Sequence, residues 1–337
     1  MQLVNLTPFP AERMLLMSER GAETLVVLVK GTYETNGSGK LVPAEEQQPI
    51  VMADEYYADP GESSLRAACD VCLSKAGTDA VLIGHACASD SQTVQVDVSL
   101  EVGPMKKTVR VLGDRRWEKG MTGLRISTPE PIERIPLVFE RAFGGVDTTS
   151  KDGPESEPRN PVGIGFRGRK SEWPLEGTDL PNLEDPTDLI TSPRSRPAPA
   201  GFGQVAPNWE PRASFAGTYD ESWQKNRMPL LPEDFDQRFF STASSGLAMD
   251  GYLEGDETVR VTHAGGAGTW KSTLPGHRLE FVVDLPDRFE IVRMELDTLL
   301  IDADSRHVVM TWRGQMDVHG MVYDVGWVKT QFEGGTR

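Results

Sequence analysis

Residues 93–102 read TVQVDVSLEV, and this stretch indicates the fold class. Apolar residues occupy every second position from Val94 to Val102, with polar or charged residues between them. Because side chains alternate between the two faces of a strand, the pattern predicts one buried and one exposed face, as in antiparallel sheets. Gly103-Pro104 predicts a turn, after which residues 107–112 (KTVRVL) predict the returning strand.

Further strand patterns lie on both sides of this hairpin. Residues 24–33 (TLVVLVKGTY) are a nearly continuous apolar run, and the turn-forming residues 34–40 (ETNGSGK) separate it from Leu41-Val42, which predicts a second hairpin. Residues 80–86 (AVLIGHA) predict a short buried strand. The last hundred residues contain four more β-rich segments, at 258–262, 279–283, 296–302 and 308–313, and ADSR at 303–306 predicts a hairpin tip. We therefore expect a mainly-β protein with antiparallel, β-sandwich-like sheets.

The segment from residue 140 to residue 240 has a different composition. It contains thirteen of the 24 prolines, which disfavour helix interiors and central strands. It also holds many aromatic residues, which disordered segments lack: Phe143, Phe166, Trp173, Phe202, Trp209, Phe215, Tyr219, Trp223, Phe235, Phe239 and Phe240. We expect a long, ordered, irregular Pro/Gly-rich insert that packs on the sheets, because ordered loops of this length tend to be functional.

One or two short helices are expected within this insert. Thr218-x-x-Glu221 has the pattern of a capping box, and Pro229 limits that helix at its other end. A second helix is expected to start at Pro232, since proline suits a first helical position. Composition thus divides the chain into an N-terminal β-rich region (1–145), a Pro-rich ordered loop region (146–240) and a C-terminal β-rich region (241–337). Whether these form one intertwined domain or separate domains stays open at this point.

Charge and hydropathy exclude several classes of protein. The net charge is −16 at pH 7, whereas a protein that binds nucleic acid needs a basic face. No apolar run approaches the roughly 20 residues of a membrane helix. The N-terminal residues lack the basic start and apolar stretch of a signal peptide, and three cysteines are a poor disulfide framework. We expect a cytoplasmic protein with no nucleic-acid or membrane partner.

The sequence offers little support for catalysis. Cys69-x-x-Cys72 has zinc-site spacing, but only His85 and Cys87 lie near enough to complete such a site, so structural thiols are favoured. No G-x-S-x-G or H-E-x-x-H motif occurs, and the glycine-rich stretches 163–168 and 265–268 lack the strand-then-helix context of phosphate binding. We expect no enzyme activity, no cofactor and no metal.

One alternative involves carbohydrate. The carboxylates of Asp220, Asp234 and Asp236 lie in the same part of the sequence as Trp209, Tyr219 and Trp223. Paired carboxylates hydrolyse glycosides, and aromatic rings stack on sugars. A carbohydrate-active enzyme or a carbohydrate-binding β-sandwich protein is therefore the second interpretation, although arginines near these acids also favour ion pairs that order the loop.

A set of short motifs occurs in a fixed order along the chain: GDRRW (113–117), ERAFGG (140–145), NPVG (160–163), LPNLE (180–184), PAGF (199–202), GTYD (217–220) and LPEDFD (231–236). Together they resemble the bacterial domain-of-unknown-function family 2169, and the resemblance covers nearly the whole chain. It departs at residues 241–249, where family members often carry a more polar segment.

This resemblance implies a role in type VI secretion. Relatives are encoded with spike proteins and toxic effectors, and act as cytoplasmic adaptors or chaperones that load an effector onto the spike. The implied partners are a secreted toxin effector, the spike protein, or both. Aromatic and arginine side chains dominate protein interfaces, and the partner-binding candidates are Trp209, Arg212, Tyr219, Trp223, Arg141 and Phe143. The acidic chain favours a neutral or basic docking region on the partner.

Overall fold

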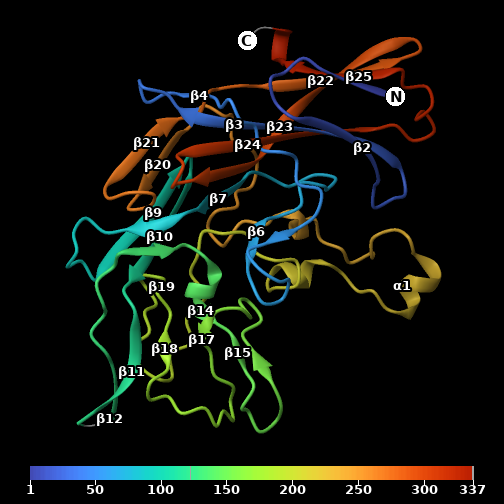
Figure 1. The fold of residues 1–337 in the computed structure, drawn as a ribbon. Helices are drawn as coiled ribbons and strands as arrows, with labels where there is room; N and C mark the ends of the chain where they lie inside the picture. Colours follow the sequence, from blue (N-terminus) through green and yellow to red (C-terminus); the bar gives the residue numbers. More distant parts are fainter. Residues whose placement is uncertain (122, 336–337) are drawn as a thin grey trace.

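The computed structural model describes residues 1–121 and 123–335. Within them, strands from both ends of the chain join in one curled sheet of nine strands (Figure 1). Seven of its strands follow the order β1-β25-β22-β23-β24-β3-β2, while β4 also pairs with β3 and β7 also pairs with β23. The bounds are β1 (Gln2–Asn5), β2 (Ala11–Met17), β3 (Glu23–Thr35), β4 (Leu41–Pro43), β7 (Asp79–Ile83), β22 (Leu279–Leu285), β23 (Arg288–Asp302), β24 (His307–Asp317) and β25 (Trp327–Phe332).

The curl of this sheet brings its two outer strands near each other. The Arg13 guanidinium Nη2 on β2 donates a hydrogen bond of 2.7 Å to the carbonyl of Met1, which precedes β1. Strand β1 is parallel to β25, so the first strand of the chain is held by one of the last. The apolar run predicted at 24–33 lies in β3, where Leu25 to Val29 are completely buried between β24 and β2.

Strand β23 changes partners along its length. Its first half pairs with β22, and its second half pairs with β24 on one side and, in parallel, with β7 on the other. The register to β24 shifts between Leu296 and Thr298, which makes Asp297 the residue of a β-bulge. Asp297 is buried, and its carboxylate Oδ2 accepts a hydrogen bond of 2.5 Å from Arg313 Nε on β24.

A second, five-stranded sheet has the order β19-β10-β9-β20-β21 among the described residues. The hairpin predicted from TVQVDVSLEV is confirmed, and the apolar positions of its first strand are buried while the polar ones are not. The bounds are β9 (Gln95–Val102), β10 (Met105–Leu112), β19 (Leu183–Glu184), β20 (Thr258–Thr262) and β21 (Thr269–Thr273). One apolar cluster contains buried side chains of both sheets, which confirms the mainly-β, sandwich-like class.

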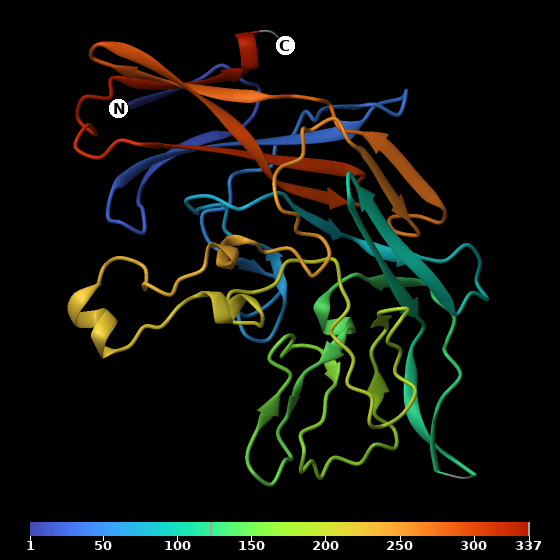
Figure 2. The ribbon, with the colours of Figure 1, turned by 180° about the vertical axis from the view of Figure 1, so that it is seen from behind.

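The Pro-rich middle of the chain is ordered and adds mostly short pieces of structure. They form the lower lobe in Figure 1 and the arm that carries α1 (Figure 2). The remaining paired strands are β5 (Glu55–Tyr56) with β6 (Leu65–Ala67), β8 (His85–Cys87) with β13 (Arg134–Pro136), β11 (Arg115–Gly120) with β12 (Gly123–Ile126) and β18 (Asp179–Leu180), β14 (Phe143–Gly144) with β17 (Ile164–Gly165), and β15 (Val146–Asp147) with β16 (Glu155–Ser156). The helices are α1 (Glu221–Asn226) and the 3-10 helices η1 (Phe139–Arg141), η2 (Arg212–Phe215), η3 (Gln237–Phe240) and η4 (Glu333–Gly335).

Three local predictions need correction. Helix α1 is capped by Asp220 and not by Thr218, because the Thr218 hydroxyl donates to Asp234 instead. The helix expected at Pro232 is absent there, where the described chain forms a turn; the next helix, η3, starts at Gln237 behind the capping side chain of Asp236. The strand predicted at 80–86 is split into β7 and β8 at Gly84, whose φ is +122°.

Two further observations concern the helices and the cysteines. Among the described residues, every helix is too short or too polar to pass through a lipid bilayer. Cys69, Cys72 and Cys87 are free thiols, and burial raises the pKa of Cys72 to about 11. This thiol is therefore protonated at neutral pH and behaves as a small apolar side chain.

Candidate functional site: a projecting arm and an aromatic pocket

Residues 216–235, which we call the arm, leave the body after η2 and return before η3, and α1 lies near the far end (Figure 1). Interactions close the base of the arm. The backbone N–H of Asp236 donates to the Phe215 carbonyl at 3.0 Å, and the Arg238 guanidinium lies 4.2 Å from the centre of the Phe215 ring. Nearby, the backbone N–H of Thr218 donates to Asp234 at 2.9 Å. The two sides of the arm are thus held together, as in a compact surface loop.

The interior of the arm is ordered by its own side chains. The Asp220 carboxylate accepts a hydrogen bond of 2.8 Å from the backbone N–H of Trp223, which caps α1. The Trp223 indole N–H donates to the Leu230 carbonyl at 2.8 Å, and the Tyr219 ring packs edge-on against the indole with centroids 4.7 Å apart. Because a six-residue helix is unstable alone, these contacts supply the order of the arm.

A turn of the large sheet also holds the arm. The Arg227 guanidinium donates one hydrogen bond to the Leu231 carbonyl at 2.8 Å and another to the Glu19 carbonyl at 2.6 Å. Glu19 belongs to the turn between β2 and β3. Leu230 packs next to Gly21 of the same turn. The arm therefore has a fixed position relative to the sheet.

The outer surface of the arm exposes large apolar side chains. Tyr219 is 54% exposed and Met228 is 60% exposed, and Trp223, which packs against the Tyr219 ring, is half-buried. Exposed side chains of this size on an ordered support are typical of protein-binding surfaces.

The structure places the six sequence-predicted residues in different environments. Trp209 and Phe143 are each 1% exposed, and the Trp209 ring packs edge-on against Phe139 in the core. Arg212 is buried as well: it donates to the carbonyls of Phe239 and Val205 at 2.7 and 2.9 Å, and burial lowers the pKa of its guanidinium. These three side chains are almost completely buried in this fold, so we leave them out of the proposed interface.

The other three candidates are accessible but do not form one cluster. Tyr219 and Trp223 lie on the arm. Arg141 is exposed at the end of η1, where its Nη1 lies 3.2 Å from Asn182 Oδ1 and 3.7 Å from Asp114 Oδ1. It lines a separate groove of about 710 Å³ that also contains residues 88–91 and 130–136.

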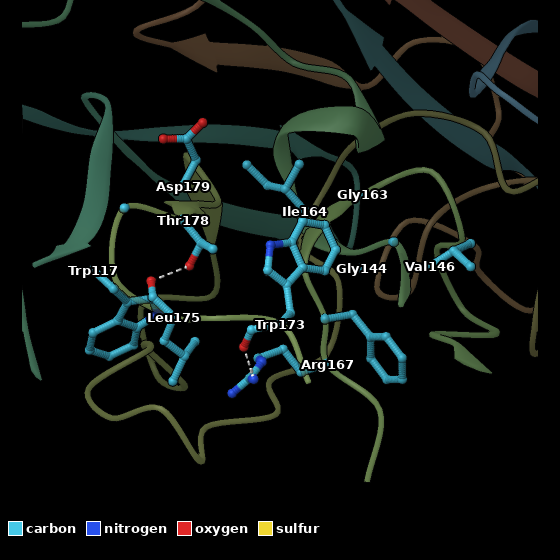
Figure 3. A pocket seen from close by; sticks show the side chains of 14 residues that line it. Trp117, Gly144, Val146, Gly163, Ile164, Arg167, Trp173, Leu175, Thr178 and Asp179 are labelled. Carbon is cyan, nitrogen blue, oxygen red and sulfur yellow. Dashed lines mark hydrogen bonds between the residues drawn. The ribbon is translucent and has the colours of Figure 1, made fainter. Parts of the chain in front are cut away.

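The lower lobe contains a pocket of about 380 Å³ (Figure 3). Its floor is the parallel pair β14 and β17, in which Gly144 lies opposite Gly165. Gly144 needs to be glycine, since a Cβ there would lie 2.1 Å from the Asn160 carbonyl oxygen. The walls are apolar and come from several elements: Trp117 of β11, Val146, Ile164, Phe166, Trp173 and Leu175.

Polar groups at the pocket come from residues 167–179. The Arg167 guanidinium donates to the Trp173 carbonyl, and the Thr178 hydroxyl donates to the Leu175 carbonyl at 2.7 Å. Asp179 is an exposed lining residue. Figure 3 shows the Trp173 indole standing between the Thr178 side and the Gly144 side of the pocket. Trp173 is 42% exposed, so part of its ring faces solvent.

Sequence reasoning missed this pocket. It noted the glycines at 163–168 but only excluded phosphate binding there, and Trp117 and Trp173 lie far apart in sequence. The useful signal was the occurrence of two closely spaced glycine pairs, Gly144-Gly145 and Gly163-x-Gly165, beside aromatic residues. Such glycines permit backbone segments to approach closely, and here they leave space above the floor.

Fold and surface together define a mainly-β protein with an ordered arm and an aromatic pocket. The chain belongs to a family described as "Uncharacterized protein conserved in bacteria" (DUF2169), which matches residues 20–313. The family resemblance seen in the motifs is thereby confirmed, whereas the secretion role that it implies stays a proposal. None of the curated proteins and none of the solved structures matches the chain.

Proposed function

We propose that this protein is a non-catalytic adaptor or chaperone that binds a type VI secretion effector in the cytoplasm of the producing cell and helps load it onto the spike complex. The observation that carries the proposal is the arm. It projects from the body, is held at its base and by the turn at Glu19, and exposes Tyr219 and Met228 to solvent.

The physical argument rests on preorganisation. A binding surface that is already ordered loses little conformational entropy when the partner docks, so more of the contact energy appears as affinity. The arm meets this condition through the cap on α1, the Trp223–Leu230 hydrogen bond and the Arg227 contacts. Its exposed Tyr and Met are residue types enriched in interface centres.

The acidic charge of the chain favours a partner whose docking region is neutral or basic. The net charge is −16, and the arm carries Asp220, Glu221, Glu233 and Asp234 against Lys225 and Arg227. An acidic docking surface steers a neutral or basic region of the partner toward it, and this steering weakens as salt screens the charges.

The test is co-expression with a toxin effector and with a spike protein of a type VI system from the same gene cluster, followed by affinity purification and titration. We expect a stoichiometric complex with the effector. The double variant Tyr219→Ala/Met228→Ala is expected to weaken it at least tenfold, since truncation of central interface residues costs about 2 kcal/mol or more. Both side chains are more than half exposed, so the fold is expected to persist.

Tyr323→Ala is the matched control, because this tyrosine is fully exposed in the turn before β25, away from the arm. Its complex is expected to have wild-type affinity. Failure to form a complex with either partner, combined with normal effector secretion after deletion of the gene, would refute the adaptor role. A complex that is indifferent to the double variant would refute the arm as its interface.

A further inference from the structure

The pocket in Figure 3 has the size and walls of a ligand site and lies apart from the arm. Its volume of about 380 Å³ falls within the range of roughly 300–1,000 Å³ that holds small molecules. Two tryptophans line it. Trp117 is 5% exposed and belongs to a small apolar cluster with Phe143, Leu180 and Ile190, whereas Trp173 is 42% exposed and belongs to the rim.

The polar groups at this pocket include both donors and acceptors. Arg167 donates from its Nη2 to the Trp173 carbonyl. Its Nε has no hydrogen-bond acceptor within the described ranges 1–121 and 123–335 and is enclosed by protein atoms, so only the outer guanidinium N–H groups can meet a ligand. The Thr178 hydroxyl donates its hydrogen bond to the Leu175 carbonyl, so the lone pairs of its oxygen can accept a hydrogen bond from a ligand. The carboxylate of Asp179, exposed at the rim, is a further acceptor.

This mixture discriminates between ligand classes. A purely apolar ligand would desolvate Arg167 and Asp179 without giving them partners, which costs free energy. An anion would meet the Asp179 carboxylate, and a cation would meet the Arg167 guanidinium. A sugar suits all of them, because its hydroxyl groups both donate and accept, and its C–H face packs on the electron-rich face of an aromatic ring.

We propose that this pocket binds a neutral carbohydrate, with the C–H face of one pyranose unit on the Trp173 indole. Hydroxyl groups of the saccharide are hydrogen-bonded to Thr178 and to Arg167 and Asp179, which lie at opposite ends of the pocket in Figure 3. Asp179 accepts from hydroxyl groups, and Arg167 donates to them. Trp117 and Leu175 form the apolar wall beside the ring. This site is independent of the proposed protein interface.

The experiment uses the full chain and a panel of named sugars: glucose, galactose, N-acetylglucosamine, maltose and chitobiose. Binding is measured by calorimetry and by the protection of tryptophan fluorescence from acrylamide. We expect saturable binding of at least one sugar and reduced quenching of the exposed Trp173. Trp173→Ala is expected to weaken binding about three- to tenfold, the size of one aromatic contact. Trp173→Phe is expected to keep most of the affinity, because it keeps an aromatic face.

Asp179→Asn tests the polar part of the site, and we expect weaker binding without loss of folding, since the side chain is exposed. Tyr219→Ala on the arm is expected to bind sugar as the wild type does. Absence of saturable binding for the whole panel up to about 10 mM, well into the weak-binding range, overturns the proposal. Saturable binding that is unchanged in both Trp173→Ala and Asp179→Asn overturns it as well. Neither result bears on effector binding through the arm.

Discussion

Asp147 organises the loops around the pocket from a fully buried position. It accepts hydrogen bonds from the backbone N–H of Thr149 at 2.8 Å, the Thr149 hydroxyl at 2.7 Å and the backbone N–H of Gly168 at 3.0 Å. Burial by itself raises the pKa of this carboxyl, but the hydrogen bonds outweigh burial and lower the pKa to about 2. The charged form is therefore the one that the fold requires.

Asp147→Asn is expected to lower the free energy of unfolding by about 1–3 kcal/mol, because the amide turns one acceptor into a donor that faces N–H groups. Urea denaturation measures the change. Asp152→Asn is the control on the same lobe: its side chain is 63% exposed, so we expect a change within about 0.5 kcal/mol. Because the folded pKa lies below the usual value, the contribution of Asp147 is complete above about pH 4. It disappears as the pH falls through 2, and the variant is expected to lack this component of acid sensitivity.

Lys107 on β10 is the opposite case, a cation that the fold disfavours. Its Nζ donates to the Ser245 carbonyl at 2.7 Å and the Ser244 hydroxyl at 3.1 Å, and burial lowers its pKa to about 8. Between about pH 8 and the usual value near 10.4 the unfolded chain binds more protons, so this residue makes the protein more stable as the pH rises. Lys107→Met is expected to remove that increase, measured as the difference in unfolding free energy across this window. Lys106→Met, with a 68% exposed side chain, is expected to keep it; an equal slope in Lys107→Met and wild type would contradict the assignment.

Among the elements, we expect the bulge in β23 to depend on a buried ion pair. Asp297 and Arg313 are 1% and 4% exposed, and Arg313 also donates to the Cys72 carbonyl at 2.9 Å. Removal of one partner leaves a buried charge without compensation, so Arg313→Met is expected to cost about 3–5 kcal/mol in urea denaturation. In an Asp297→Asn background the same change is expected to cost much less, because no charge is left behind.

The partly exposed pair Arg110–Asp97 provides the comparison for this cycle. Arg110→Met is expected to cost about 1 kcal/mol or less, as for pairs near the surface. If Arg313→Met were as mild as Arg110→Met, or equally costly with and without Asp297, the bulge would not depend on the pair.

At the scale of elements, secondary structure could be predicted where it follows from a local sequence pattern. The hairpin at 93–112 and the strand at 24–33 could be predicted because their side-chain patterns are local. The start of α1 could not be predicted, because both Thr218 and Asp220 have side chains that can cap a helix. The Thr218 hydroxyl donates to Asp234, sixteen residues away, and Asp220 caps α1 instead. Likewise, nothing near Gly84 indicates that β7 continues one sheet while β8 pairs with β13.

At the scale of the whole molecule, both the interface candidates and the pocket depend on long-range packing. Trp209 and Tyr219 look alike in sequence as aromatic residues of a Pro-rich loop, yet one is in the core and the other is exposed. The pocket forms because the pairing of β11 with β18 carries Trp117 next to residues 173–179. Class and family could be predicted from the chain, whereas the surface that each side chain faces could not.

The pairing of β1 with β25 has a consequence for biosynthesis. Gln2 is opposite Trp327, so the ribosome must translate every strand between them before β1 can pair with β25. Elongation proceeds at about 5–20 residues per second. Strand β1 therefore stays without its partner strand for many seconds. A premature stop codon shortly before the codon for Trp327 would remove β25 and leave β1 unpaired, so we expect the truncated product to be degraded by quality-control proteases.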